Sequence, residues 1–334
     1  MNMKKIGIIG AGSWGIALAS LLQTNGNQVT VWSIIAEEIE MLKREHEHID
    51  KLPGVKLSSD MIFTTELKDA VEGMDFIILA VPSPFTRSTA KMLKDIVAKD
   101  QIVINVAKGI EEATLMTLSE VIEEELPQAK VAVLSGPSHA EEVGRGMATT
   151  IVIGCEDHEE AVYLQDIFMS EMFRVYTSED VKGIELGAAL KNVIALAAGM
   201  ADGLGCGDNA KAALITRGIA EIARLGVVMG CKRETFYGLT GMGDLIVTCA
   251  SMHSRNRRAG ILIGQGASME EAMKEVKMVV EGVYSAKAAL GLAKKHNVQI
   301  PIIEQVNEVL FDGKHVGQAM KDLMLRDKKI EYAD

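Results

Sequence analysis

The N-terminal half of the chain alternates between short apolar runs and segments in which apolar residues recur at helical spacing. Short apolar runs bounded by turn residues are typical of buried β-strands, and apolar residues at i, i+3, i+4 and i+7 are typical of amphipathic helices. The pattern predicts strands over residues 5–9, 28–32, 76–81, 101–107, 131–135 and 149–154. It predicts helices between them over residues 16–22 and 36–46 and around residues 92–97 and 118–126.

The predicted strands are apolar along most of their length. Such strands have both faces buried, which is typical of a parallel sheet covered by helices on its two sides. The first half of the chain is therefore predicted to be an α/β domain with a parallel sheet.

Beyond about residue 180 the strand patterns fade and helical patterns take over. Helices are predicted over residues 183–201, 209–229, 234–238, 255–264, 268–276, 281–295, 302–311 and 315–324. A chain of 334 residues is longer than one core usually supports, because single cores rarely grow past about 250 to 300 residues. We therefore expect two domains, a sheet domain over residues 1–182 and a mainly helical domain over residues 183–334.

Three glycines with the spacing G-x-G-x-x-G, Gly10, Gly12 and Gly15, join the first predicted strand to the first predicted helix. In a dinucleotide-binding turn the first glycine allows the sharp turn, the second lets backbone approach a pyrophosphate, and the third lets the helix pack on the strand. The motif alone is weak, because glycine-rich turns are common. Its place at the start of an alternating strand and helix pattern favours a Rossmann-type fold that binds a dinucleotide.

The end of the second predicted strand reads Ser33-Ile34-Ile35. At this place a dinucleotide fold usually carries an acid that holds the ribose hydroxyls of NAD, or an arginine near the extra phosphate of NADP. Neither residue type is present. The sequence therefore leaves the choice between NADH and NADPH open.

Composition narrows the function classes. The formal net charge of −11 argues against a broad nucleic-acid or acidic-membrane surface, so an anion site must be a local basic cluster. The four cysteines, at positions 155, 206, 231 and 249, form no C-x-x-C pair, and we expect no metal site. The N-terminal segment continues smoothly into the fold and no uncharged apolar run of about 20 residues occurs, so we expect a cytoplasmic protein without membrane insertion.

The loops that follow the predicted strands carry polar residues. They include Pro82–Pro84, Lys108–Glu111 and Gly136–Ala140. Open α/β sheets bind ligands outside the carboxyl ends of their strands, so these loops are interpreted as ligand contacts, although they can also be ordinary turns. Lys108 stands out as a cation next to a glycine.

Lys191 and Asn192 stand alone in an apolar helix rich in small residues. One interpretation is a lysine whose stem is buried while its ammonium reaches water. The other is a desolvated ammonium, whose pKa falls from about 10.4 towards neutral pH, where it can donate or accept a proton. The absence of a polar face beside Lys191 favours the second interpretation.

Two further clusters lie in the helical half. Asp244 follows two glycines and either caps a helix or bonds a substrate hydroxyl or Lys191. Ser254 is a plausible N-cap, which places the arginines of residues 255–258 in the first turn of a helix. Cations at that position oppose the helix dipole, so the arrangement favours a phosphate site over a solvated basic face.

Several motifs in the right order make the chain resemble the bacterial NAD(P)-dependent glycerol-3-phosphate dehydrogenases, nearly end to end. The resemblance is carried by Gly7–Ala19, Leu52-Pro53-Gly54, Ala107–Glu111, Ser135–Ser138, Leu190–Val193, Gly241–Leu245, Ser254-Arg255-Asn256 and Val279–Gly282. It implies a Rossmann domain followed by a helical domain like the C-terminal domain of 6-phosphogluconate dehydrogenase. It also implies reduction of dihydroxyacetone phosphate to sn-glycerol 3-phosphate by NADPH or NADH, feeding phospholipid synthesis.

The same resemblance implies roles for individual residues. Lys191 is similar to the family's catalytic acid and base, and the implied substrate contacts are Lys108, Gly136, Ser138, Lys191, Asp244, Ser254, Arg255 and Asn256. The implied cofactor contacts are Gly10, Gly12, Ser13, Trp14, Gly15, Lys108, Ala140, Arg255, Val279 and Glu281. The family commonly has an arginine near position 34, where this chain has Ile34.

Two alternatives stay open beside this resemblance. The first is another two-domain dehydrogenase, acting on a hydroxy acid, and the second is a non-catalytic NAD-binding protein. The Ser254–Arg258 cluster with Lys108 favours phosphate over carboxylate, and a pure sensor has no need of Lys191. The Ala- and Met-rich helical half also suggests a homodimer.

Overall fold

A computed structural model describes residues 3–328 and 330–331 of the chain; the outer bounds of the two expected domains, residues 1 and 334, lie outside them. The first half contains an eight-stranded sheet with the order β3-β2-β1-β4-β5-β6-β7-β8. The strands are β1 (Lys5–Ile9), β2 (Gln28–Trp32), β3 (Ile62–Thr64), β4 (Phe76–Leu79), β5 (Ile102–Asn105), β6 (Lys130–Ser135), β7 (Thr149–Gly154) and β8 (Phe173–Ser178). The predicted α/β class is confirmed.

The sheet departs from the prediction in three respects. β6 and β7 pair antiparallel, whereas every other neighbouring pair is parallel. β3 is missing from the predicted strands because it has only three residues. β8 is missing because Arg174 and Tyr176 alternate with its buried residues, as expected of an edge strand. The remaining strands coincide with the predicted runs to within a few residues.

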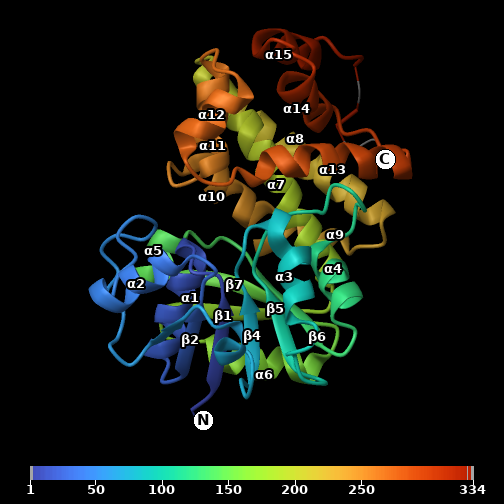
Figure 1. Cartoon of the computed structure of the whole chain (residues 1–334). Helices are drawn as coiled ribbons and strands as arrows, with labels where there is room; N and C mark the ends of the chain where they lie inside the picture. Colours follow the sequence, from blue (N-terminus) through green and yellow to red (C-terminus); the bar gives the residue numbers. More distant parts are fainter. Residues whose placement is uncertain (1–2, 329, 332–334) are drawn as a thin grey trace.

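Helices cover both faces of the sheet (Figure 1). They are α1 (Ser13–Thr24), α2 (Ala36–Glu45), α3 (Thr86–Leu93), α4 (Leu118–Glu125), α5 (Ala140–Gly144) and α6 (His158–Phe168), with short 3₁₀ turns at Leu67–Ala70 and Ser83–Phe85. Ile6 and Ile8 of β1 join one core with α1 and α6, and Ile9 joins a second core with α3 and α4. This alternation follows from the two-residue period of a strand.

The helical half lies above the sheet in Figure 1. Its helices are α7 (Val181–Gly203), α8 (Gly207–Val228), α9 (Arg233–Tyr237), α10 (Asp244–Ala250), α11 (Arg255–Gly264), α12 (Met269–Val276), α13 (Glu281–His296), α14 (Pro301–Phe311) and α15 (Val316–Met324). A π-turn over Leu239–Gly243 leads into α10. All predicted helices of this half are confirmed, whereas α10 was missed. The division of the chain after residue 182 stays a prediction.

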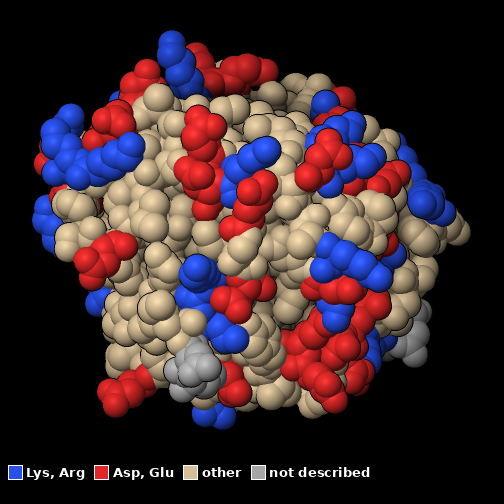
Figure 2. Space-filling model, turned by 60° about the horizontal axis from the view of Figure 1, so that its bottom comes forward, with Lys and Arg blue, Asp and Glu red and all other residues tan. Residues whose placement is uncertain are grey.

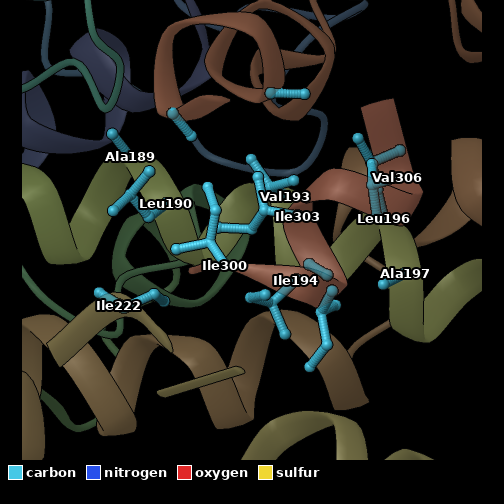
Figure 3. Packing of buried hydrophobic residues seen from close by; sticks show 14 of the residues in the cluster. Ala189, Leu190, Val193, Ile194, Leu196, Ala197, Ile222, Ile300, Ile303 and Val306 are labelled. Carbon is cyan, nitrogen blue, oxygen red and sulfur yellow. The ribbon is translucent and has the colours of Figure 1, made fainter. Parts of the chain in front are cut away.

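α7 is the central helix of this half. Every residue from Gly183 to Ala201 is buried, and α7 packs against α8, α11 and α13. Figure 3 shows Leu190, Val193 and Ile194 of this helix facing side chains of α8 and α14. By length and composition α7 would be able to cross a membrane, but its apolar window of 18 residues is entirely buried inside the protein. Its apolar character is therefore explained by its place in the core.

Charged residues of both signs are interspersed on the underside of the sheet half. Figure 2 shows this face with acidic side chains gathered on one side and with no continuous basic surface among the described residues. The face therefore offers no extended surface for a polyanion.

Candidate active site

The residues singled out from the sequence meet at the carboxyl edge of the sheet, where it faces α7, α10 and α11. Lys108 follows β5 and Gly136 follows β6, while Lys191 lies on α7 and Asp244 begins α10. Lys108 Nζ donates to Gly136 O at 2.9 Å and lies 2.6 Å from Asp244 Oδ2. The two halves of the chain therefore share one polar cluster.

Asp244 joins two lysines. Lys191 Nζ lies 3.1 Å from Asp244 Oδ1 and donates to Thr248 Oγ1 at 2.7 Å. The predicted alternative that the Lys191 head reaches water is wrong, because the residue is only 5% exposed. The capping alternative for Asp244 is also wrong, because its carboxylate contacts Lys108, Lys191 and Thr248, and the N-cap Gly243 has no side-chain bond.

The electrostatics of the cluster suit proton transfer. Burial lowers the pKa of Lys191 to about 8, an effect that the neighbouring Asp244 charge partly offsets and the Lys108 charge strengthens. Burial by itself would raise the pKa of Asp244, but the charges of Lys108 and Lys191 reverse this and hold the pKa below its usual value. At neutral pH the site thus contains an ionised carboxylate between two ammonium groups, one of which gives up its proton easily.

The side chains of the basic cluster at the start of α11 have different partners. Ser254 is the N-cap, as predicted, and accepts from Arg257 N at 3.1 Å. Arg257 Nε is paired with the carboxylate of Asp202 at 2.8 Å, so this arginine of the predicted cluster is neutralised within the protein. Arg258 Nε is buried without a hydrogen-bond partner among the described residues. Arg255 donates to Val279 O at 3.2 Å, and burial lowers its pKa.

Asn256 connects this cluster to the lysines. Its Oδ1 accepts from Gly282 N at 2.8 Å, and its Nδ2 donates to Asn192 Oδ1 at 3.0 Å. Asn192 lies next to Lys191 on α7, and its Nδ2 reaches Lys108 O at 3.5 Å. Among the described residues, Asn256 Nδ2 donates only to Asn192, which leaves one amide hydrogen for a ligand.

The glycine turn has the geometry that dinucleotide binding requires. Gly10 has φ +119°, and a Cβ there would lie 2.6 Å from Ala80 O, so only glycine fits. A Cβ at Gly15 would lie 2.2 Å from Gly10 O, whereas one at Gly12 would meet nothing within 4 Å. Gly12 is the N-cap of α1 without a side-chain bond, so the first N–H groups of α1 stay available for a pyrophosphate.

The remaining predicted cofactor contacts lie around this turn and across from it. Trp14 Nε1 is buried without a partner among the described residues, and Ala140 begins α5, which packs on α1. Glu281 Oε1 accepts from Ser83 N at 3.1 Å, and Ser83 Oγ donates to Glu281 Oε2. Glu281 therefore connects the helical half to the loop after β4, whereas Val279 is bonded to Arg255 within the helical half. These groups fit a nicotinamide dinucleotide lying across the carboxyl edge of the sheet.

Comparison with known proteins agrees with this geometry. Residues 5–161 match the description NAD-dependent glycerol-3-phosphate dehydrogenase N-terminus, and residues 180–321 match the C-terminus of the same family. The chain belongs to this family. The resemblance seen in the sequence, and with it the oxidoreductase class and a nicotinamide cofactor, is confirmed.

Named relatives of the family match over almost their whole length. The glycerol-3-phosphate dehydrogenase (NAD(P)+) of Agathobacter rectalis is 63% identical over 331 residues, which are 99% of this chain and 98% of the relative. That of Bacillus subtilis is 51% identical over 335 residues, covering 99% of this chain and 97% of the relative. The crystal structure of glycerol-3-phosphate dehydrogenase from Coxiella burnetii has a TM-score of 0.94 at 35% identity and covers 97% and 99% of the two chains.

Two further side chains lie at this cluster that were not identified individually from the sequence. Thr248 lies one helical turn after Asp244, and its Oγ1 accepts a hydrogen bond from Lys191 Nζ; the i, i+4 spacing on a helix was the available signal. His139 lies in the loop after β6, with its ring centroid 5.8 Å from that of His253. Burial, followed by the charges of Lys191 and Lys108, lowers the pKa of His139 and keeps the imidazole neutral.

Proposed function

We propose that the chain catalyses the reversible reduction of dihydroxyacetone phosphate to sn-glycerol 3-phosphate with NADH or NADPH, supplying glycerophospholipid synthesis. The observation that carries the proposal is the buried ammonium of Lys191, held with Lys108 on Asp244 at the same edge of the sheet as the dinucleotide turn. Family membership supports the choice of substrate, because the relatives are named for glycerol 3-phosphate.

The polar cluster supplies the acid and base chemistry. When bound, the nicotinamide supplies the hydride that reaches C2 of the substrate. Lys191 donates a proton from Nζ to the C2 oxygen, and Lys108 adds positive charge near that oxygen. Asp244 stays ionised and holds both ammonium groups in place. In the reverse direction the neutral amine of Lys191 accepts the proton from the C2 hydroxyl.

The start of α11 supplies the phosphate site. Ser254, Arg255 and Asn256 would bind the phosphate with the free N–H groups of the first helical turn. Gly136 and Ser138 would contact the substrate from the sheet half, where Ser138 Oγ donates to Gly136 O at 2.9 Å. Binding energy from the phosphate would then hold C2 near Lys191.

The dinucleotide would lie along the glycine turn and reach towards the helical half. Its pyrophosphate would contact the N-terminus of α1. The proposed cofactor contacts are Gly10, Gly12, Ser13, Trp14, Gly15, Lys108, Ala140, Arg255, Val279 and Glu281.

The test of this function is Lys191→Ala, assayed with dihydroxyacetone phosphate and NADH or NADPH. Loss of the proton donor should lower kcat by about 10²- to 10⁴-fold, since general acid catalysis contributes that much. Binding of NADH or NADPH, followed by fluorescence titration, should change little. Lys182→Ala is the matched control, because Lys182 lies on the same helix and pairs with Glu120 away from the site. Turnover within a few fold of the native enzyme would remove Lys191 from the mechanism.

The same assay separates the alternatives. A hydroxy-acid dehydrogenase would reduce a keto acid and leave dihydroxyacetone phosphate unchanged. A non-catalytic NAD-binding protein would bind the cofactor and turn over neither substrate. The buried Lys191 and the arginines at the start of α11 favour the phosphate substrate over both.

We further propose that the enzyme is a cytoplasmic homodimer that inserts into no membrane and binds no nucleic acid. The proposal rests on the acidic surface and on the Ala- and Met-rich helical half. A mass of one chain in light scattering would contradict the dimer.

A further inference from the structure

The end of β2 lies beside the dinucleotide turn. Gly10 N, in the turn, donates to Trp32 O, the last residue of β2, at 2.9 Å. The residues that follow, Ser33, Ile34 and Ile35, therefore lie where a dinucleotide fold meets the adenosine ribose. The 2′-phosphate that distinguishes NADPH from NADH would come to the same place.

The hydroxyl of Ser33 makes its hydrogen bonds within its own segment. Its Oγ donates to Glu38 Oε2 at 2.8 Å and accepts from Ile35 N at 3.2 Å. The residue is only 5% exposed. Ser33 is thus not available to bind a phosphate.

The lysine near this segment is paired with Glu38. Lys51 Nζ donates to Glu38 Oε1, and His48 Nε2 lies 3.7 Å from the same oxygen. Burial acts to raise the pKa of Glu38, but the nearby His48 ring and the hydrogen bonds from Lys51 and Ser33 lower it to about 2. Glu38 therefore remains an anion, and Lys51 provides no surplus positive charge.

The exposed part of the segment is apolar or acidic. Ile34 is 72% exposed and Ile35 is 45% exposed. α2 begins directly afterwards with Glu37 and Glu38 in its first turn. Residues 33–38, all of which the structure describes, include no basic side chain. A 2′-phosphate would thus meet two carboxylates and two isoleucines, which is unfavourable for a dianion.

We infer that the segment Ser33–Glu38 makes this enzyme select NADH over NADPH. The selection acts against the 2′-phosphate through the exposed carboxylate of Glu37, through Glu38, which neutralises Lys51, and through the absence of a cation at Ile34. Ile34 and Glu38 are accordingly the specificity-determining residues. This inference rests on the proposed use of a nicotinamide cofactor.

The test is equilibrium binding of NADH and of NADPH to the full-length enzyme without substrate, followed by nucleotide fluorescence. NADH should bind at least about tenfold more tightly than NADPH. Equal binding, or tighter binding of NADPH, would overturn the inference. Binding of neither nucleotide would instead contradict the proposed function.

The variant Ile34→Arg supplies the missing cation. It should increase the affinity for NADPH by at least about tenfold, with little change for NADH, and the gain should shrink as ionic strength rises. Ile62→Arg is the matched control, because Ile62 is an exposed isoleucine on the neighbouring strand β3, opposite Thr30 and away from the end of β2. An equal gain in both variants, or none in Ile34→Arg, would contradict the assignment of Ile34.

Glu38→Gln provides a second measurement. It removes one carboxylate and frees Lys51, so it should also increase NADPH affinity relative to NADH. Thermal unfolding shows whether this variant stays folded. If it unfolds, Glu37→Gln tests the same electrostatic effect at an exposed position, where a smaller gain for NADPH is expected. An unchanged preference in a folded variant would show that the carboxylates play no part.

Discussion

At the residue scale, the behaviour of the site depends on how burial and charge set the proton affinity of Lys191. Burial lowers its pKa to about 8, and Asp244 keeps the pKa from falling further. Two neighbours move away from this range, because burial and the lysine charges lower the pKa of His139 and burial raises that of Cys249 to about 12. Lys191 is therefore the group to which we assign a titration just above neutral pH.

This assignment predicts opposite pH profiles for the two directions of the reaction. In reduction Lys191 must be protonated, so kcat/KM for dihydroxyacetone phosphate should fall as pH rises through about 8. In oxidation Lys191 must be neutral, so kcat/KM for sn-glycerol 3-phosphate should rise through the same range. The second pKa of the substrate phosphate is near 6, which is below the pH range in which the titration of Lys191 changes kcat/KM. Initial rates in both directions, measured in buffers of constant ionic strength, provide the test.

Asp244→Asn identifies the group that titrates. Removal of the carboxylate should shift the alkaline limb to lower pH, because the Asp244 charge raises the pKa of Lys191. His139→Gln is the control and should leave the position of the limb unchanged, since the imidazole is already neutral at pH 8. A limb that stays in place in Asp244→Asn would assign the titration to another group.

At the element scale, the long apolar helix was predictable and the shorter elements were not. α7 was expected over residues 183–201 and extends from Val181 to Gly203, because a long run of mostly small and apolar residues, interrupted over 183–201 only at Glu185, Lys191 and Asn192, fits few alternatives. α6 was missed, although Asp157 caps it, because only part of its surface is apolar. α10 was missed because the glycines before Asp244 suggested a flexible turn, whereas they form a π-turn that leads into the helix.

The site, too, could be predicted only in part from the sequence. Local motifs identified Lys108, Lys191 and Asp244 one at a time, since each stands out from its neighbours in the sequence. Their pairing joins residues 136 positions apart, and only the folded chain brings them together. Arg257 belongs to the same basic run as Arg255, but its Nε donates to Asp202 on α7. No local sequence pattern predicts this pairing, because the two residues lie on different helices.

The contact between α7 and α11 sets the distance between Lys191 and the start of α11. Gly199 and Gly203 of α7 lie against Gly260 and Gly264 of α11. A Cβ at Gly260 would lie 2.3 Å from Leu196 O and 2.9 Å from Gly199 Cα. Both are backbone atoms that cannot move aside without separating the helices.

Gly260→Ala should therefore destabilise the enzyme although alanine favours helix formation. Overpacking of this kind costs about 1–3 kcal/mol, which outweighs the gain of about 1 kcal/mol in helix propensity. Denaturant unfolding measures the effect, and a higher KM for dihydroxyacetone phosphate should accompany it because α11 carries Arg255. The control is Gly317→Ala in the first turn of α15, where the nearest atom is a His315 ring nitrogen at 3.3 Å. Unchanged stability in Gly260→Ala would mean that the two helices separate without cost.

At the scale of the whole molecule, the sheet half and the helical half are joined through Glu185, which is buried on α7. Its Oε1 accepts from Asn105 Nδ2 of β5 at 2.9 Å and from Ser119 N of α4 at 3.0 Å. Asn105 Oδ1 in turn accepts from Ala107 N at 3.1 Å, next to Lys108. Glu185 thus fixes the position of the loop that carries Lys108 relative to α7.

Glu185→Ala should consequently affect both stability and catalysis. It leaves buried donors of Asn105 and Ser119 without partners, at a cost of about 1–3 kcal/mol for each. Loss of the Asn105 contact should also displace Lys108, so kcat/KM for dihydroxyacetone phosphate should fall by at least about tenfold. Glu221→Ala is the matched control: this buried carboxylate accepts from Ile302 N at 2.9 Å within the helical half, so its removal should lower stability and leave kcat/KM nearly unchanged. Equal losses of kcat/KM in the two folded variants would mean that Glu185 contributes only to stability and does not position Lys108.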